Sequence, residues 1–509
     1  MNSQKRMAVN IVILYVKLIV TIVVNLISTR IILNAMGVED YGIVNLISGI
    51  VAMLSFIQNS MSVSSQRYLS FTMGKHNFEQ IIEVFNSSYF LHILLGCFLF
   101  ITLEALVPII FDSSIQIPEA RIHSAKILYQ LTVIGTCLVI ITVPYDALLN
   151  AHENMLTFSI VSIIESFVRL AGAFILIGYG HDKLIFYGFL LVFIRTLSMI
   201  IKQIYCLKHY PECKIKPRFL KKKLMKEMFS FAFWNMFGAL ALTGRNQGVA
   251  VVMNLFLGVI VNAAYGIANQ IMGQLNNFTA TISKAMNPQI MQKAGAGDNE
   301  GMIRLALKQS KYSSILLSYA VLPLFFSMPF ILKIWLKVVP EYCIDFCRLI
   351  LFVSLFQQLS AGMMSMVQAN GKIRTYQIII SLILLLNIPT SYFMLKAGAT
   401  PPFVILSMIV IEMFVCIARV CFAINIVGLK LYDFICLLLI PILFLYGFSG
   451  IILYFLNNQI IQTIQNELFG FITFFIFSII VTTISVMLIL NKNEKVIIKG
   501  AISKRFRKR

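Results

Sequence analysis

Basic side chains stand inside the apolar stretches of this sequence, where a charge is rarely found without a function. About eleven lysine and arginine residues remain in or near these stretches once the loops are set aside. Each costs roughly 2.5–3.5 kcal/mol at the centre of a bilayer, so we expect the central ones to face a wet cavity or a carboxylate. They are Lys17, Arg30, Arg67, Lys126, Arg169, Arg195, Lys202, Arg245, Lys284, Arg348 and Arg419.

Arg245 has the most informative surroundings. It lies within residues 243–248, a stretch that is too polar to face lipid and whose glycines permit close packing or a local break. Arginine presents paired N–H donors in a fork that matches the oxygens of a phosphate group. Lys126, Lys202 and Arg348 lie nearer the ends of their stretches, where we expect long side chains to reach the membrane interface.

Few acidic side chains accompany these cations. The candidates are Glu104, Glu165 and Glu412. Glu165 and Arg169 are four residues apart, so a helix brings them to one face as a structural ion pair. Glu412 and Arg419, seven residues apart, suggest the same arrangement. The alternative is that these carboxylates bind H⁺ or Na⁺ and couple a transport step to an ion gradient.

The stretches that hold these residues are long enough to cross a membrane. Of the 509 residues, 59% are hydrophobic and only 12% are charged, whereas a soluble chain carries roughly a quarter charged residues. A membrane span needs about 20 mostly apolar residues. The sequence therefore predicts an all-α polytopic membrane protein with about fourteen transmembrane helices, near residues 8–33, 43–71, 87–111, 123–145, 154–178, 184–206, 229–257, 259–286, 310–332, 344–368, 375–397, 403–427, 432–456 and 467–491.

The distribution of positive charge predicts the topology. The net charge of +21 comes mainly from loops and the C-terminal tail, with about 26 lysines and arginines in the predicted inside segments and about 5 outside. Both termini are therefore expected in the cytoplasm. The predicted organisation is an N-lobe, a basic cytoplasmic linker that acts as a hinge, a C-lobe, two further helices and a basic cytoplasmic tail, at residues 1–207, 208–228, 229–427, 428–491 and 492–509.

The two halves repeat one another. Residues 41–45 recur as residues 265–269, and Gly37 precedes the first segment as Gly258 precedes the second. Residues 150–154 likewise correspond to residues 368–372. Because each half has six spans and starts on the same side, the copies must be parallel and related by an axis along the membrane normal. We predict two parallel six-helix lobes plus two extra C-terminal helices.

This order of spans is accompanied by segments that carry a family resemblance. They are residues 30–43, 66–71, 245–248, 262–268 and 287–290. The chain resembles the multidrug/oligosaccharidyl-lipid/polysaccharide exporter superfamily, and within it the polysaccharide-unit (Wzx-type) flippases. The resemblance implies a MATE-like fold, in which two lobes enclose a central cavity and open alternately to the two sides of the membrane.

The resemblance also implies a cargo and a set of residues that bind it. The cargo would be an oligosaccharide linked to an isoprenoid diphosphate of the undecaprenyl type, destined for O-antigen, capsule or another surface polysaccharide. Because the first two helices of each half line the cavity in this superfamily, the substrate-binding candidates are Arg245, Lys17, Arg30, Arg67, Lys284, Asn246 and Gln247. An inner-gate or lipid-headgroup contact is the alternative for Arg67.

Further expectations concern location and partners. We expect the bacterial inner membrane, contacts with membrane lipids and with other polysaccharide-assembly membrane proteins, and no nucleic acid. No spacing among the nine cysteines suggests a metal site, and no cofactor is expected beyond H⁺ or Na⁺.

Three other functions are weighed. A peptidoglycan-precursor flippase would also use a cationic cavity for a lipid diphosphate. A cation-coupled drug exporter of the same superfamily would carry an aspartate in its first span, where this chain has Lys17 and Arg30. A polymerase or ligase would need a large external loop with catalytic residues, whereas the predicted outer loops are short and hold no such constellation.

Overall fold

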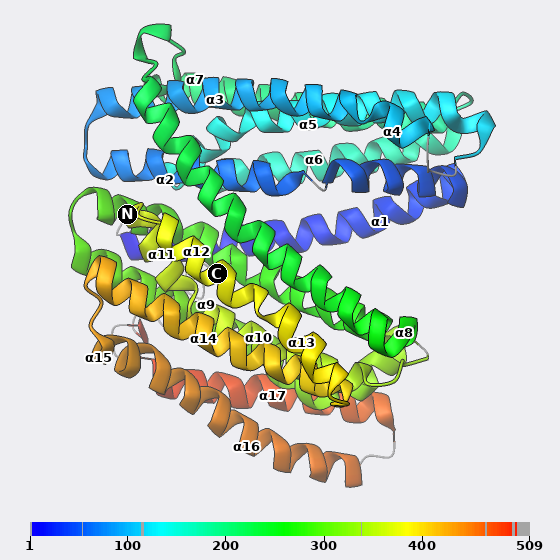
Figure 1. Cartoon of the computed structure of the whole chain (residues 1–509), viewed down its shortest axis with the longest axis vertical. Coiled ribbons are helices and arrows are strands. Elements are labelled where there is room, and N and C mark those ends of the chain that lie inside the picture. The colour runs from blue at the N-terminus through cyan, green and yellow to red at the C-terminus, as the bar shows by residue number, and fades with distance from the viewer. Residues whose placement is uncertain are drawn as a thin grey trace, which may run out of the picture. The chain divides into compact units, whose positions relative to one another are not determined.

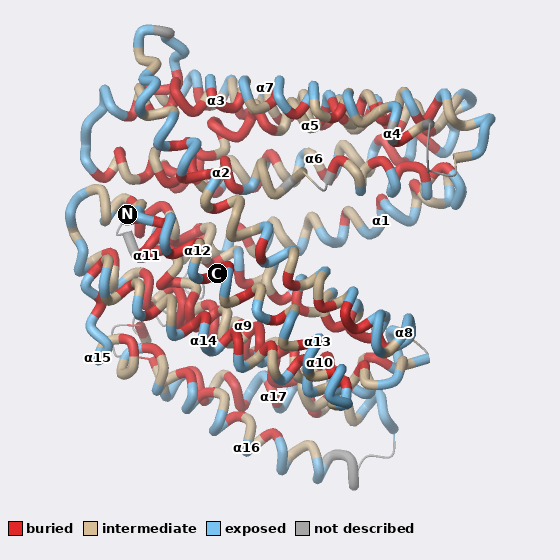
Figure 2. Tube along the Cα trace, in the orientation of Figure 1, coloured by how far each residue is buried: buried red, intermediate tan, exposed pale blue. Residues whose placement is uncertain are grey.

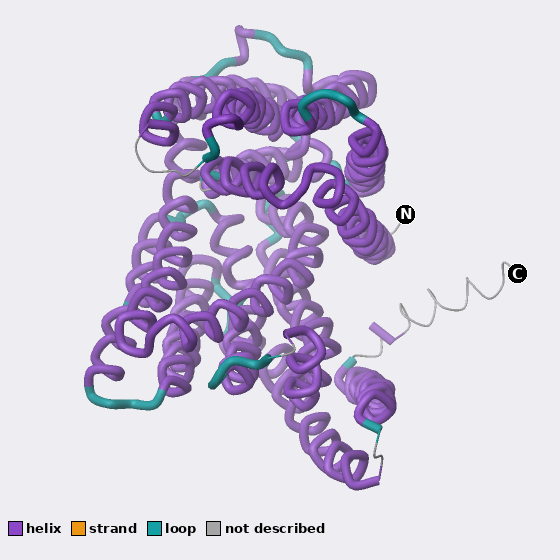
Figure 3. The backbone as a smooth tube through the Cα atoms, turned by 90° about the vertical axis from the view of Figure 1, so that its right-hand side faces the viewer, coloured by secondary structure: helices purple, strands orange, loops and turns teal. Residues whose placement is uncertain are grey.

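The computed structural model is built from helices (Figure 1, Figure 3). It describes residues 3–490 apart from 53, 113–116, 337 and 464–465, together with residues 494–495. No strand occurs among these residues, and the predicted tail lies outside them except for residues 494–495. Twelve helices in the described part are long and apolar enough to cross a membrane. The prediction of an all-α polytopic membrane protein is confirmed.

The helices follow one another with mostly short connections. They are α1 (Ser3–Ala52), α2 (Ser55–Gly74), α3 (Phe78–Ala105), α4 (Val107–Asp112), η1 (Glu119–Arg121), α5 (Ile122–Ala151), α6 (Met155–Gly178), α7 (Lys183–His209), η2 (Pro211–Cys213), η3 (Pro217–Phe219), α8 (Lys222–Gly295), α9 (Asn299–Leu336), α10 (Cys343–Leu359), α11 (Ala361–Asn370), α12 (Arg374–Leu385), α13 (Asn387–Lys396), α14 (Pro401–Val427), α15 (Leu431–Phe434), the π-helical η4 (Ile435–Leu439), α16 (Ile440–Thr463) and α17 (Glu467–Ile489).

Two compact units divide the chain. The N-unit comprises Arg6–Met236 and Met291–Gly297, and the C-unit comprises Met1–Lys5, Phe237–Ile290 and Asp298–Arg509. Residues 222–236 at the start of α8 therefore pack in the N-unit, whereas the sequence placed residues 222–228 in the linker and residues 229–236 in the C-lobe. The Ser64 hydroxyl donates a 2.8 Å hydrogen bond to the Met228 carbonyl, and the Phe231 ring meets the Tyr68 ring edge to face.

Helices α1 and α8 each contain one residue whose backbone leaves the helical region. Gly37 has φ 83° and ψ 169°, and Gly258 has φ 75° and ψ −175°. Only glycine adopts this combination readily, so each residue ends one helix and starts the next in a new direction. These bends separate the first and second predicted spans of each half, near residues 8–33 and 43–71 and near residues 229–257 and 259–286. The total of fourteen crossings stays a prediction.

Left-handed residues recur at matching places in the two halves. His76 follows α2 with φ 55°, and Gly297 follows α8 with φ 74°. Glu153 follows α5 with φ 58°, and Gly371 follows α11 with φ 91°. The repeat seen in the sequence is therefore also a repeat of backbone conformation at the helix ends.

Two spans that the sequence predicts as continuous helices are interrupted. The span near residues 344–368 breaks between α10 and α11 at Ser360, whose hydroxyl bonds to the Phe356 and Gln357 carbonyls of the preceding turn. The span near residues 375–397 breaks between α12 and α13, where Asn387 Nδ2 donates to the Leu384 carbonyl. Such bonds from a side chain to the backbone of the preceding turn bend helices.

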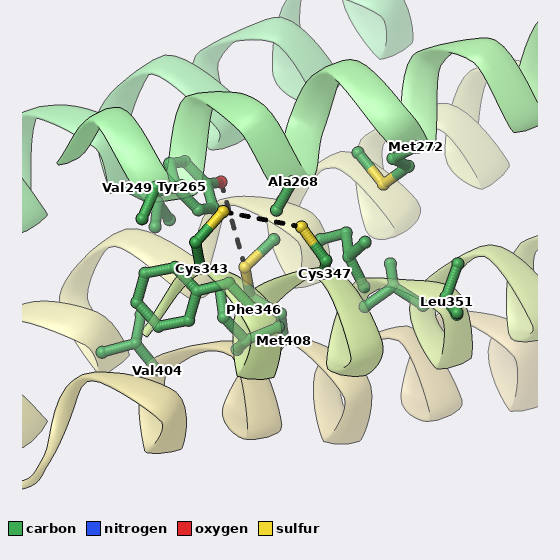
Figure 4. Close-up of a cluster of buried hydrophobic side chains, with 14 of the residues drawn as sticks. Val249, Tyr265, Ala268, Met272, Cys343, Phe346, Cys347, Leu351, Val404 and Met408 are labelled. Atoms are coloured by element: carbon green, nitrogen blue, oxygen red, sulfur yellow. Dashed lines mark hydrogen bonds between the residues drawn. The ribbon is translucent and has the colours of Figure 1, made fainter. Parts of the chain in front are cut away.

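Burial differs between inner and peripheral helices (Figure 2). In the C-unit, side chains of α8, α10 and α14 meet in one apolar cluster, in which the Tyr265 hydroxyl contacts the Met408 sulfur (Figure 4). Cys343 and Cys347 lie one turn apart in this cluster as free thiols. In contrast, α16 buries a single stripe of residues three or four apart, as expected of a helix with one packed face. The stripe comprises Ile442, Leu445, Ser449 and Leu453.

Candidate functional site

A polar cavity lies inside the N-unit. Its volume is about 470 Å³, and α1, α2, α3, α5, α6 and α7 all contribute to its wall. Two arginines line it, Arg169 from α6 and Arg195 from α7. The other polar side chains of the wall are Ser48, Gln58, Thr132, Thr136 and Tyr187.

The charge of this cavity is positive. No acidic side chain is among the described residues that line it, and neither arginine forms an ion pair with a described carboxylate. The Nε of Arg169 is buried and lacks a hydrogen-bond partner within the described part of the chain. Since a buried donor without an acceptor costs about 1–3 kcal/mol, this arrangement favours water or an anion as the occupant.

A second group of charges lies on neighbouring helices of the same unit. The Lys202 ammonium lies 2.9 Å from a carboxylate oxygen of Asp146, and the Lys17 ammonium lies 5.2 Å from the centre of the Phe158 ring, which Lys202 also faces at 5.6 Å. The negative charge of Glu165 lies close enough to Lys17 and Arg195 to stabilise their positive charges. Lys202 is only 6% exposed and has Asp146 as its partner, and its reach to the membrane interface stays a prediction.

Arg67 is enclosed by aromatic rings. Its guanidinium lies 4.6 Å from the ring centres of Tyr68 and Phe71 and 5.6 Å from that of Phe231. Contacts with ring faces stabilise a cation without neutralising it. At 7% exposure, Arg67 is buried within the N-unit, where Phe231 comes from the first turns of α8.

Arg245 is the most deeply buried of the predicted cations. Its side chain is 0% exposed, and its Nη1 donates a 2.8 Å hydrogen bond to Glu412 of α14, which is 2% exposed. Its Nε donates to the side-chain oxygen of Asn246 at 3.1 Å, whereas its buried Nη2 has no partner among the described residues. The structure therefore joins a predicted substrate ligand and a predicted coupling carboxylate in one ion pair.

The two ion pairs predicted from sequence spacing do not form. Glu412 pairs with Arg245 rather than with Arg419, whose Nη1 donates a 2.8 Å hydrogen bond to the Ser360 hydroxyl. Arg169 and Glu165 form no ion pair in the described structure, because the Arg169 side chain lines the cavity instead. Spacing along one helix predicts only partners on that helix. It therefore missed that Glu412 pairs with a residue of α8 and that Arg169 lines a cavity.

The remaining candidates are dispersed. Arg30 and Gln247 are exposed, and Lys284 is half-buried. Glu104 is also half-buried and accepts a 3.0 Å hydrogen bond from the Gln130 amide. For Glu412, uptake of H⁺ or Na⁺ would require displacement of the guanidinium it already holds, whereas Glu165 has no such direct partner among the described residues.

An apolar groove lies in the C-unit between α9, α10 and α16. It has a volume of about 540 Å³ and is lined by aliphatic and aromatic side chains, including Phe325, Phe352, Leu355 and Tyr454. No charged residue is among the described residues of its wall. The groove can therefore hold a hydrocarbon chain but offers nothing to an anion.

The sequence and fold match known proteins. A family model described as polysaccharide biosynthesis protein matches residues 5–293, which is more than half of the chain. The chain belongs to this family. One protein with a similar sequence is the uncharacterized membrane protein EpsK of Bacillus subtilis, which is 20% identical over 298 residues. That alignment covers 57% of this chain and 57% of EpsK, so the chain spans little more than half the length of this relative.

Solved structures establish the fold of this polysaccharide biosynthesis protein. MATE in the bent conformation superimposes with a TM-score of 0.74 at 13% identity, covering 84% of this chain and 96% of that one. A MOP-superfamily transporter from Pyrococcus furiosus, described as having a binding pocket of reverse polarity, gives a TM-score of 0.73 at 14% identity over 84% of this chain and 96% of its own. The predicted MATE-like fold and the predicted family are confirmed.

Proposed function

We propose that this protein moves an oligosaccharide linked to an isoprenoid diphosphate from the cytoplasmic to the outer leaflet of the bacterial inner membrane by alternating access. The observation that carries the proposal is the N-unit cavity lined by Arg169 and Arg195 without an acidic side chain among its described lining residues. Two guanidinium forks in a membrane helix bundle suit a diphosphate, which offers several acceptor oxygens to each.

Cations in the path lower the cost of bringing a diphosphate to mid-membrane. Lys17, Arg30, Arg67 and Lys284 retain their proposed role as further cationic contacts during passage. Arg245 does not serve as a diphosphate ligand while it is paired with Glu412, because this carboxylate already compensates its charge. An inside-negative potential then supplies direction, worth about 2.3 kcal/mol per charge per 100 mV and about twice that for a cargo with two negative charges.

The apolar part of the cargo needs its own surface. The groove of the C-unit between α9, α10 and α16, whose described wall carries no charge, suits a hydrocarbon chain by its chemistry. A cationic drug is disfavoured, because Arg169 and Arg195 would repel it.

The experiment uses the full-length chain in proteoliposomes. A short isoprenyl diphosphate linked to a fluorescent disaccharide is loaded into the bilayer, and its appearance in one leaflet is followed by quenching under an imposed potassium diffusion potential. We expect flipping that accelerates when the diphosphate side is negative. The double variant Arg169→Gln and Arg195→Gln should flip at least tenfold more slowly.

The matched control is Lys126→Gln, which removes a basic residue that faces the Phe111 ring and does not line the cavity. This variant should retain the normal rate. A normal rate in the double arginine variant would overturn the assignment of the cavity. Equal rates with and without the potential, at constant ion gradients, would overturn the proposed driving force.

A further inference from the structure

The end of α8 and the end of α2 meet backbone to backbone within the N-unit. A Cβ atom added to Gly74, the last residue of α2, would overlap the Gln292 carbonyl and lie 2.7 Å from its carbon. A Cβ added to Gly295, the last residue of α8, would overlap the Phe71 carbonyl and lie 2.8 Å from its carbon. Each glycine thus sits against the residue three positions before the other glycine.

This reciprocity follows from the internal repeat. Gly74 and Gly295 occupy equivalent positions, since the left-handed residues His76 and Gly297 each follow two positions later. The next residue on each side caps the following helix: the Asn77 side chain accepts the Gln80 N–H and the Asp298 side chain accepts the Gly301 N–H. Two equivalent helix ends that contact each other in the same way form a self-complementary interface.

A short segment of the chain packs in the N-unit through this contact. Residues 291–297, here called the strap, belong to the N-unit, yet the chain on both sides of the strap belongs to the C-unit. Besides the glycine contacts, the Gln292 amide donates a 2.7 Å hydrogen bond to the Ala151 carbonyl at the end of α5. Met291, at the start of the strap, is 1% exposed.

We propose that the strap and the end of α2 form a gate on the side that the sequence predicts to be cytoplasmic. The gate is closed when the two glycines allow backbone contact, and it opens when the strap leaves the end of α2. Small residues permit helices in a membrane to approach this closely, and such an approach is lost at once when a side chain is added. The gate requires movement of the strap but no particular cargo.

Cysteine accessibility tests the gate without reference to transport. Met291→Cys is introduced into the full-length chain, and its reaction with a membrane-impermeant maleimide is compared with that of the unmodified chain in inside-out vesicles and in spheroplasts. We expect slow labelling, confined to inside-out vesicles. Adding Gly74→Ala or Gly295→Ala should raise the labelling rate at least tenfold, because the closed contact cannot form.

Gly49→Ala is the matched control, since a Cβ at Gly49 of α1 meets nothing within 4 Å, and it should leave the labelling rate unchanged. Gln292→Ala removes the hydrogen bond to Ala151 without adding volume, so it also opens the strap and keeps the test decisive if a glycine variant misfolds. Unchanged protection of Met291→Cys in the glycine variants that fold and in Gln292→Ala would overturn the proposal. Labelling from spheroplasts alone would overturn the assigned side.

Discussion

Removal of one partner of the Arg245–Glu412 pair should strongly destabilise the C-unit. Both side chains are almost fully buried, at 0% and 2% exposure, and their closest atoms are 2.8 Å apart. Glu412→Met would leave a buried guanidinium without a counter-charge, and Arg245→Met would leave a buried carboxylate. Breaking a buried pair in this way costs about 3–5 kcal/mol.

The double variant should behave differently. Methionine is close in volume to both residues, and replacing a buried pair by apolar side chains is often neutral or stabilising. We therefore expect Arg245→Met with Glu412→Met to lie within about 1 kcal/mol of the unmodified chain, which gives a coupling energy of at least about 5 kcal/mol between the two sites.

Unfolding in mixed micelles of increasing SDS content measures these free energies. Each single variant should lower the ratio of folded to unfolded protein about a hundredfold or more, since 1.4 kcal/mol corresponds to a factor of ten. The flipping assay on the double variant then separates stability from function: a stable double variant that no longer flips its cargo assigns Arg245 or Glu412 to the transport cycle. Additive losses in the double variant, or single losses below about 1 kcal/mol, would refute the reasoning.

Two further predictions concern the backbone and pH. Gly37→Ala and Gly258→Ala should each cost about 1–3 kcal/mol in the same unfolding assay, because a side chain is strained at these dihedral angles, and wild-type stability in either variant would contradict this. Burial tends to raise the pKa of Asp182, but hydrogen bonds from the Ser124 hydroxyl and from backbone N–H groups lower it below its ordinary value. A lowered pKa adds stability above the unfolded pKa of about 3.9, and this stability is lost as the pH falls through the folded pKa. The difference in stability between the unmodified chain and Asp182→Asn, measured by thermal unfolding, should therefore shrink below about pH 4. A difference that does not depend on pH would contradict this prediction.

The sequence was most informative about features with a period or a repeat. Long apolar stretches predicted helices, and the recurrence of Gly37 as Gly258 indicated the repeat, but the bend at each glycine is visible only in the structure. The breaks at Ser360 and Asn387 were not predicted, since polar residues of this kind also occur inside straight helices.

Partners between helices were beyond the reach of sequence spacing. Arg245 and Glu412 are 167 residues apart, and nothing along the chain signals that α8 and α14 bring them together. Arg195 and Arg169 were among the cations counted within spans, yet the cavity they share is formed by six helices and appears only in three dimensions. Composition gave the number and type of intramembrane charges, while tertiary packing decided which of them were neutralised.

The division of α8 between the two units bears on how the protein is made. A ribosome that has completed the helices up to α7 has not yet produced residues 222–236, which cover α2 and α3, or residues 291–297, which contact the end of α2. The apolar surface beside Met61 and Leu91 therefore stays uncovered until α8 emerges. The N-terminal half is completed by segments translated after it, so a nascent chain truncated at the linker should be held by insertion machinery or degraded rather than released as a finished lobe.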